Sequence, residues 1–528
     1  MPRAMQQLSP QDAAFIEADT SHANANVSLL HIYDQSTAPG GTVRFKTLME
    51  HIESRLERSP IFRRRLMRVP FGVDRPYWVD DAYFDIEYHV RHIALPKPGD
   101  WRQFCIQASR IHARALDFER PLWEIYVIEG LDAFTDLPAG SFALLTKTHL
   151  AALGGLPAGQ GGDANALFTE LLHDLTAQPV VPAPPAPWFA RPAPRAASLL
   201  RKGLTHAVRD VAPTALAWAS DKLRHSAPVV PTRFGSVVSP HRVFDTRRFA
   251  LDEFKAIRTL VEGATVNDAV LAVCGGALRR YLDALDELPT HSLNAMAPLS
   301  VNATAAVKAR LDWQLIELAT DISDPVQRLR AICEQTASSA LFEGAVRATE
   351  LTDAARYASS QTLALASRLL GGAALVQGRR APLANCSITN VPGPAQPEFL
   401  CGARLSYLSA LMPISDGLGL AITVTSVAGR IIISPTSCRE LMPQPEVFAN
   451  CLRESFQELL AAALRRTTAQ ARAQTQTRIQ TQTQTRVTPK VKTAAPLARA
   501  TNALARATKP RARRPSASDK TSRADPAV

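Results

Sequence analysis

Seven prolines fall between residues 179 and 194 of this 528-residue chain. Proline fixes φ and removes a backbone donor, so neither a helix nor a central strand can run through this segment. A chain of this length is also too long for a single hydrophobic core. The sequence therefore predicts two folded domains, residues 1–176 and 241–466, joined by a proline-rich linker and a bridging helix over residues 177–240.

Both predicted domains alternate strand-like and helix-like stretches, which indicates a mixed α/β fold. Apolar and β-branched residues dominate the runs 27–33 and 122–128, which are predicted as strands. Residues 45–58 and 267–282 have the spacing of helices. In the second domain, Ala428-Gly429 separates two strand-like runs and predicts a hairpin.

The composition changes after residue 466. Residues 467–528 hold 13 Lys or Arg, two Asp and no aromatic residue, so most of the chain's net charge of +12 lies there. Such a segment cannot bury enough apolar surface to offset its chain entropy, and we expect it to be disordered. It is expected either to attach weakly to anionic lipid or to remain a solvated extension. Without aromatic residues for base stacking, no specific nucleic-acid binding is predicted.

Cysteine and histidine spacing gives no sign of a metal site. The seven cysteines are scattered, which predicts reduced thiols, and His89 and His92 lack a third ligand nearby. The first twelve residues lack the apolar run of a signal peptide, and no apolar run is long enough to span a bilayer. We therefore expect a cytoplasmic protein, with any lipid contact peripheral, at the inner membrane face or at lipid inclusions.

One segment carries a modified catalytic motif. Residues 147–155 read Lys-Thr-His-Leu-Ala-Ala-Leu-Gly-Gly and follow a predicted buried strand. They resemble the His-His-x-x-x-Asp-Gly motif of a large group of acyltransferases. His149 matches the first histidine, whereas Leu150 stands at the second histidine and Gly154 at the aspartate.

Six other blocks resemble the bacterial wax ester synthase/diacylglycerol acyltransferase family. In family order they are residues 8–15, 84–92, 116–124, 265–282, 297–300 and 390–394. The resemblance implies two chloramphenicol-acetyltransferase-like sandwich domains with a tunnel at their interface. Acyl-CoA would enter from one side and the acceptor alcohol from the other, with acyl-CoA as a substrate and no cofactor.

The same resemblance implies an O-acyltransferase that moves a fatty acyl group from acyl-CoA to diacylglycerol or a long-chain alcohol. The second histidine would take the hydroxyl proton, and the aspartate would hold the loop. Substrate-binding roles are implied for Pro121, Leu122 and Trp123 and for Asn267 and Asp268. Core packing is the alternative for Trp123, and helix capping is the alternative for Asn267 and Asp268.

Two hypotheses follow from the altered motif. Leu150 has no titratable group and Gly154 has no side chain, and general base catalysis contributes about 10²–10⁴-fold. The chain is then either a family enzyme of weak or lost activity or a non-catalytic paralogue that binds acyl-CoA or lipid. His149 could serve as the base only if its side chain faced the tunnel. Adjacent strand residues face opposite sides of a sheet, so His149 faces away from the tunnel if Leu150 faces into it. Transfer from a carrier protein, as in condensation domains, is a weaker alternative.

Two further predictions concern residues around the linker. His173 follows the motif on a helix and is expected to face solvent. The run 196–225 mixes basic and apolar residues and is predicted as a helix that packs on the body or, less favourably, lies on anionic lipid.

Overall fold

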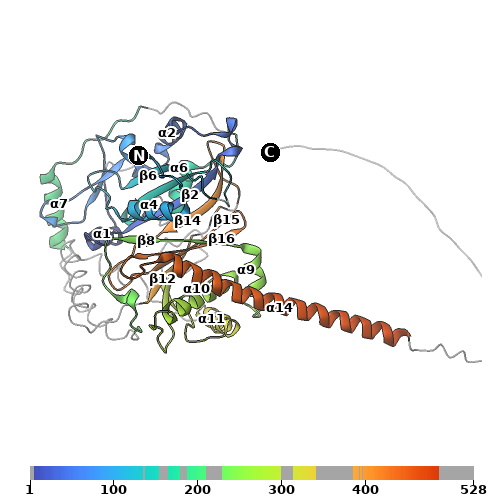
Figure 1. Ribbon diagram of the computed structural model, residues 1–528. Coiled ribbons are helices and arrows are strands. Elements are labelled where there is room, and N and C mark those ends of the chain that lie inside the picture. The colour runs from blue at the N-terminus through green and yellow to red at the C-terminus, as the bar shows by residue number, and fades with distance from the viewer. Residues whose placement is uncertain are drawn as a thin grey trace, which may run out of the picture. The chain divides into compact units, whose positions relative to one another are not determined.

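Two large β-sheets organise the chain (Figure 1). The computed structural model describes residues 5–134, 137–153, 164–178, 187–209, 229–298, 313–339, 384–391, 393–394 and 396–486. Contacts divide the chain into a first unit that ends at Thr468 and a second that begins at Ala469. Both large sheets lie in the first unit, and the predicted α/β class is confirmed.

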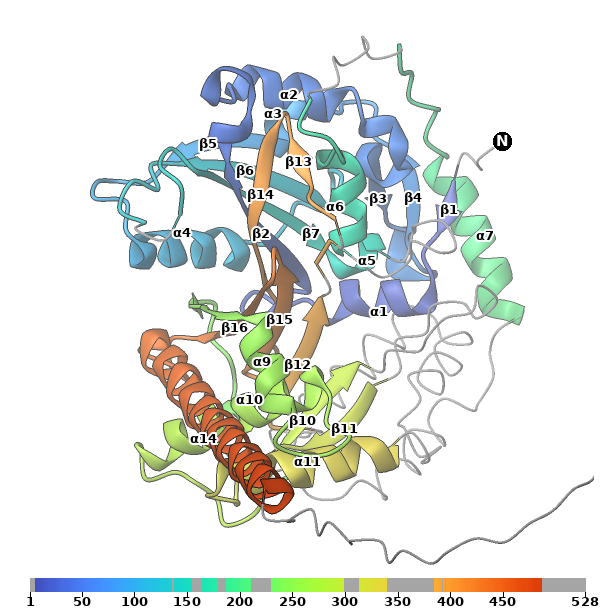
Figure 2. The same cartoon turned by 90° about the vertical axis from the view of Figure 1, so that its right-hand side faces the viewer.

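The first sheet has six strands in the order β13-β14-β2-β7-β6-β5. Large apolar residues make β2 and β7 almost wholly buried, as the sequence predicts for a sheet covered on both sides. Helix α4 covers one face, and helices α2 and α6 cover the other (Figure 2). The bounds are Phe399–Leu400 (β13), Ala403–Leu411 (β14), Asn26–Asp34 (β2), Phe142–His149 (β7), Trp123–Glu129 (β6), Val90–Ala94 (β5), Trp101–Ala113 (α4), Phe45–Glu53 (α2) and Ala164–Leu172 (α6).

The second sheet runs in the order β11-β10-β12-β15-β16-β8, with β9 also paired to β16. Helices α9, α10, α11 and α14 share one hydrophobic core with it. The predicted hairpin is confirmed, since Val427 pairs with Arg430 across Ala428-Gly429, and both turn residues have positive φ. The bounds are Trp313–Glu317 (β11), Asn294–Pro298 (β10), Cys386–Val391 (β12), Ala421–Val427 (β15), Arg430–Cys438 (β16), Arg242–Phe244 (β8), Arg247–Ala250 (β9), Leu251–Arg258 (α9), Val266–Asp283 (α10), Pro325–Ser339 (α11) and Pro445–Arg486 (α14).

Strand β14 crosses between the two halves of the chain. It follows β12 in sequence but pairs with β2 in the first sheet, from Arg404 opposite Asp34 to Leu411 opposite Ser28. A hydrogen bond of 2.7 Å joins the hydroxyls of Ser409 on β14 and Ser434 on β16. The first sheet is therefore completed by the predicted second domain, an exchange that the linker-based division at residues 177–240 does not anticipate.

Smaller elements surround the first sheet. Helix α7 packs through Leu199 and Gly203 on Val69, Val73 and their neighbours, which is the packing alternative predicted for this run. Residues 210–225 of that predicted helix lie outside the described residues. The remaining bounds are Gln6–Gln7 (β1), Tyr77–Asp80 (β4) and Arg64–Met67 (β3), which form a three-stranded sheet, and Pro10–Ala18 (α1), Ile86–His89 (α3), Leu150–Leu153 (α5) and Ala196–Arg209 (α7).

Helix α14 differs from the prediction for the end of the chain. Up to Ala463 it buries an apolar stripe at helical spacing: Phe448, Leu452, Phe456, Leu459 and Ala463. It then continues to Arg486, through residues for which the composition predicts disorder. Alanine, glutamine and arginine are good helix formers, and the side chains of residues 464–477 are exposed, so this part of the helix depends on intrinsic propensity and not on burial. Residues 487–528 lie outside the described residues.

A close backbone approach explains one glycine of the block 390–394. A Cβ on Gly393 would lie 1.5 Å from the carbonyl oxygen of Ser426 on β15. We expect Gly393→Ala to lower the free energy of unfolding by about 2–3 kcal/mol, because the backbone of β15 must move. Urea unfolding measures this, with the exposed Gln396→Ala as the matched control. Equal stability of the two variants would contradict the close approach.

Candidate active site

The altered motif lies where strand β7 gives way to a short helix. His149 is the last residue of β7, and Leu150 is the first residue of α5. The turn is fixed by backbone hydrogen bonds from His149 to the carbonyl of Leu122 (3.3 Å) and from Leu150 to that of Ala25 (2.9 Å). Gly154 lies outside the described residues.

His149 has no free ring nitrogen for proton transfer. Its Nδ1 accepts a hydrogen bond from the backbone N–H of Ala151 (3.1 Å), so the ring proton resides on Nε2. That nitrogen donates to the Asp19 carboxylate (3.2 Å). The side chain is 1% exposed and meets the ring of Phe118 edge to face. We therefore interpret His149 as a residue that fixes the motif turn, and we no longer propose it as the base.

Leu150 occupies the base position with an apolar side chain. It is half-buried and packs against the core of the first sheet. It cannot accept a proton, so the motif as it stands supplies no general base through either His149 or Leu150.

The block Pro121-Leu122-Trp123 supports the motif turn from the neighbouring strand. All three residues are buried. The carbonyl of Leu122 accepts hydrogen bonds from the hydroxyl of Thr148 (2.9 Å) and from the N–H of His149. Trp123 stacks on His89 with ring centroids 4.4 Å apart, and its Nε1 donates to the carbonyl of Phe62 (3.0 Å). These contacts support the core-packing alternative for Trp123.

Asn267 and Asp268 open α10 in the second half of the chain. Asn267 is exposed, whereas Asp268 is buried and completes a capping box with Thr265. The other carboxylate oxygen of Asp268 accepts the hydroxyl of Thr336 on α11 (2.8 Å). The geometry supports the capping alternative for Asp268.

The two residues of this pair should therefore differ in their effect on stability. We expect Asp268→Ala to lower the free energy of unfolding by about 1–3 kcal/mol, because it leaves the Thr265 N–H and the Thr336 hydroxyl without their acceptor. Asn267→Ala is the matched control and should change stability by less than about 0.5 kcal/mol. Thermal unfolding of both variants tests this, and a larger effect of Asn267→Ala would refute the capping role.

Beside the motif, the sheet buries charges that sequence reasoning passed over. Lys147 precedes His149 on the same face of β7, its side chain is wholly buried, and its Nζ lies 3.4 Å from the Glu124 carboxylate on β6. Burial lowers the pKa of the Lys147 ammonium, against the opposing effect of Glu124. On α4, burial and the charges of Arg242 and Lys147 lower the pKa of His112 to about 3. In the sequence, a lysine inside an apolar run is the feature that could have indicated these buried charges.

Asp12 is the second residue that sequence reasoning missed, although it lies within the block 8–15. Helix α1, which carries it, packs against the motif helix α5. Ser9 Oγ donates to Asp12 Oδ2 (2.6 Å), and the backbone N–H of Asp12 donates back to Ser9 (3.1 Å). Burial raises the pKa of the Asp12 carboxyl to about 6, although the bonds from Ser9 and an electrostatic interaction with His149 favour its ionised form.

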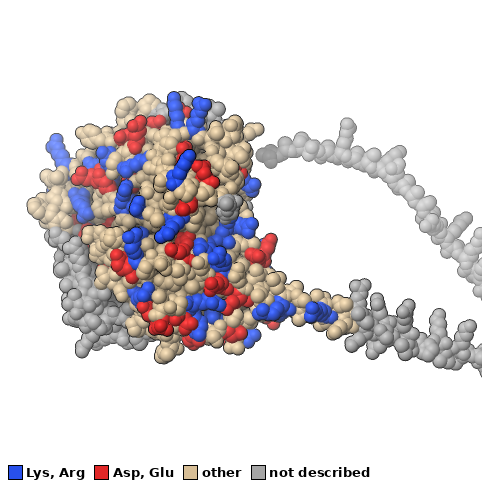
Figure 3. Space-filling model, in the orientation of Figure 1, with Lys and Arg blue, Asp and Glu red and all other residues tan. Residues whose placement is uncertain are grey.

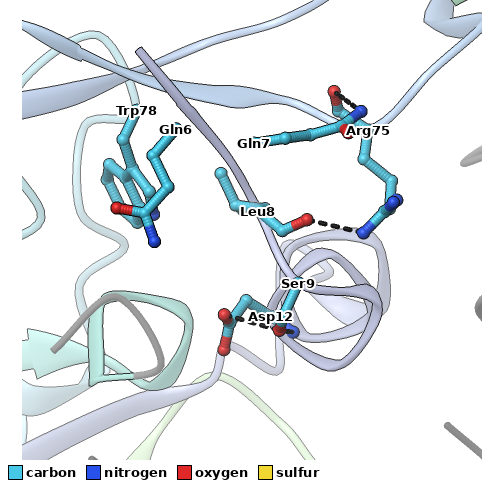
Figure 4. A pocket seen from close by; sticks show the side chains of 7 residues that line it. All are labelled: Gln6, Gln7, Leu8, Ser9, Asp12, Arg75 and Trp78. Carbon is cyan, nitrogen blue, oxygen red and sulfur yellow. Dashed lines mark hydrogen bonds between the residues drawn. The ribbon is translucent and has the colours of Figure 1, made fainter. Parts of the chain in front are cut away.

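A cavity of about 260 Å³ lies above this carboxyl (Figure 4). Its polar lining comes from Gln6, Gln7, Ser9, Asp12 and Arg75. The apolar part is formed by Leu8 and Trp78, each 1% exposed. The exposed lining is mostly polar, so it matches the hydroxyl end of a small ligand.

The remaining histidines have structural contacts. The prediction for His173 is wrong: the side chain is buried, its Nε2 lies 2.6 Å from the Tyr33 hydroxyl, and its Nδ1 lies 2.6 Å from the Glu398 carboxylate. The helix ends at Leu172, so the following turn directs this residue inward against β2. The described part of the chain holds no group of three potential metal ligands, and its seven cysteines are free and buried.

Comparison with known proteins places this architecture in a family. The model of the wax ester synthase/diacylglycerol acyltransferase catalytic domain matches residues 8–270, and that of the family's C-terminal domain matches residues 310–460. A solved wax ester synthase/diacylglycerol acyltransferase from Marinobacter aquaeolei has the same fold, with a TM-score of 0.63 at 24% identity over 87% of this chain and 100% of that one.

Relatives in mycobacteria agree with this match. A putative diacylglycerol O-acyltransferase of Mycobacterium tuberculosis is 30% identical over 87% of this chain and 90% of its own length. A putative diacylglycerol O-acyltransferase of Mycobacterium bovis is 30% identical over 86% of this chain and 99% of its own length. The chain belongs to the wax ester synthase/diacylglycerol acyltransferase family.

Proposed function

We propose that this protein transfers a fatty acyl group from acyl-CoA to the hydroxyl of diacylglycerol or a long-chain alcohol. The observation that carries the proposal is the family match over both halves of the chain, residues 8–270 and 310–460. The relatives reported above bear the name putative diacylglycerol O-acyltransferase, and the match covers nearly their whole length.

The overall reaction needs only the two substrates. The acceptor hydroxyl attacks the thioester carbonyl, the carbon–sulfur bond breaks, and the hydroxyl proton ends on the thiol of CoA. Acyl-CoA therefore serves as a substrate, and the proposal includes no cofactor. A group that takes the proton during attack is still required for an appreciable rate.

Both acceptors are poorly soluble in water, so the enzyme must reach them at a lipid surface. We propose that the protein is cytoplasmic and makes peripheral contact with the inner membrane face or with a lipid inclusion. In the described part of the chain, no helix combines the length and apolarity that crossing a bilayer demands. The visible face in Figure 3 mixes Lys and Arg with Asp and Glu over the first unit, which favours reversible contact over strong electrostatic attachment.

The test is an assay of the full chain with radiolabelled palmitoyl-CoA and either 1,2-dioctanoylglycerol or hexadecanol. The proposal predicts labelled triacylglycerol or wax ester, with one free CoA thiol released for each ester. A mixture without acceptor measures background hydrolysis. Binding of palmitoyl-CoA without ester formation from either acceptor would overturn the proposal and favour the binding paralogue.

A further inference from the structure

A family enzyme with leucine at position 150 needs another group to take the acceptor proton, and the cavity beside the motif contains one. Asp12 is 4% exposed and lies on α1, the helix that packs against the motif helix α5. An electrostatic interaction with His149 links the carboxyl to the motif turn. Gln6 and Ser9 in the lining are exposed, so the cavity is open to incoming molecules.

We propose that the cavity lined by Asp12 binds the hydroxyl of the acceptor alcohol, and that Asp12 is the general base of acyl transfer in this chain. The inference rests on the proposed function. The hydroxyl proton passes to the Asp12 carboxylate as the oxygen bonds to the thioester carbon. The carbon–sulfur bond then breaks, and the proton passes from Asp12 to the CoA thiolate, so the carboxylate is regenerated.

The carboxylate of Asp12 can accept a further hydrogen bond. Oδ2 accepts the Ser9 hydroxyl at 2.6 Å, and the backbone N–H of Ser9 also bonds to the carboxylate. Figure 4 shows the carboxyl at the Ser9 end of the cavity lining. An ionised carboxylate offers about four lone-pair sites, so an alcohol hydroxyl can donate to one that Ser9 leaves open.

The cavity walls are mostly polar and suit the hydroxyl end of an acceptor. Trp78 lines the cavity, and its buried indole Nε1 has no partner within the described part of the chain. The guanidinium of Arg75 donates to the carbonyl of Leu8 (2.7 Å), which holds the wall of the cavity. Buried polar groups without partners select a ligand that supplies hydrogen bonds.

The protonation state of Asp12 is suited to the task. A base works best when its pKa lies close to the working pH, and burial raises the pKa of Asp12 to about 6. The carboxyl is then ionised above pH 6 and more basic than an ordinary aspartate. Arg75 lies in the cavity wall, and His149 at the motif turn interacts electrostatically with the carboxyl.

The main test is the pH dependence of turnover in the full chain. Wild type should lose kcat as pH falls through about 6. Asp12→Asn should lower kcat by about 10²–10⁴-fold without changing the affinity for palmitoyl-CoA. Asp12→Glu should recover part of the rate. The matched control is Glu17→Gln, a carboxylate on the same helix that pairs with Arg68, and it should keep wild-type kcat.

A second variant separates a base from a merely structural residue. Ser9→Ala removes the hydrogen bond that favours the ionised carboxylate, so the acid limb of the kcat profile should move to higher pH while the plateau at high pH remains. A structural role for Asp12 would not produce this movement. Retention of wild-type kcat and pH profile by Asp12→Asn would overturn the inference and leave the proposed function intact.

A binding measurement distinguishes the inference from the proposed function. Binding of 1,2-dioctanoylglycerol and of hexadecanol to wild type and to Asp12→Ala is measured without acyl-CoA, and binding should weaken at least about tenfold in the variant, as expected for the loss of a hydrogen bond to a charged group. Equal binding would overturn the acceptor site. A third outcome is that the acceptor binds in an Asp12-dependent way but wild type shows no turnover. This result would support the acceptor site, but it would overturn the role of Asp12 as a base and refute the proposed function.

Discussion

Replacing Glu124 by leucine should lower the free energy of unfolding by about 3–5 kcal/mol, because it leaves the ammonium of Lys147 buried without a counter-ion. Among the described residues, the Lys147 Nζ has one carboxylate within salt-bridge distance, that of Glu124 at 3.4 Å. Denaturant unfolding measures the loss. Glu129→Gln, at the exposed end of the same strand, is the control and should change stability by less than about 0.5 kcal/mol.

The pH dependence of the Glu124→Leu variant gives an independent check. Burial holds the pKa of Lys147 below its ordinary value of 10.5, and loss of Glu124 lowers it further. The unfolded chain then binds more protons than the folded one at neutral pH, so the stability of the variant should rise as pH increases toward 10. The double variant Glu124→Leu/Lys147→Met should recover most of the loss, since neither charge remains buried. A deficit that grows with pH would contradict the role given to Lys147.

Local pattern was sufficient for many elements of the fold. The strands β2, β6 and β7 are apolar along their length, and helices α2 and α10 have helical spacing, so burial and period identify them. The partner of β14 could not be predicted, because its apolar pattern is the same whichever sheet it joins. Only the fold of the whole chain brings β14 beside β2.

The site shows the same division between local and tertiary information. The motif segment and its two departures, Leu150 and Gly154, can be identified from sequence. The occupation of both His149 nitrogens cannot, because Asp19 approaches from a distant part of the chain. The burial of Asp12, and its place beside α5, also depend on how α1 packs. In the sequence, Asp12 has the spacing of a capping residue behind Ser9, which is the local role it also performs.

The central claim is that the proton-accepting group of this enzyme has moved from position 150 to Asp12. The most direct test adds the family motif back to a chain that lacks Asp12, as Leu150→His with Gly154→Asp in the Asp12→Asn background. Position 150 is half-buried at the start of α5, so an imidazole can be accommodated there. Its return should restore a general base, and such a base is worth about 10²–10⁴-fold.

The measurement is kcat with palmitoyl-CoA and 1,2-dioctanoylglycerol for wild type, Asp12→Asn and the restored variant, all above pH 7. Palmitoyl-CoA binding and thermal unfolding serve as controls that each variant folds. The account predicts a severe loss in Asp12→Asn and recovery of at least about tenfold in the restored variant, a part of what a general base contributes. Wild-type kcat in Asp12→Asn, or a loss that the returned histidine leaves unchanged, would contradict it.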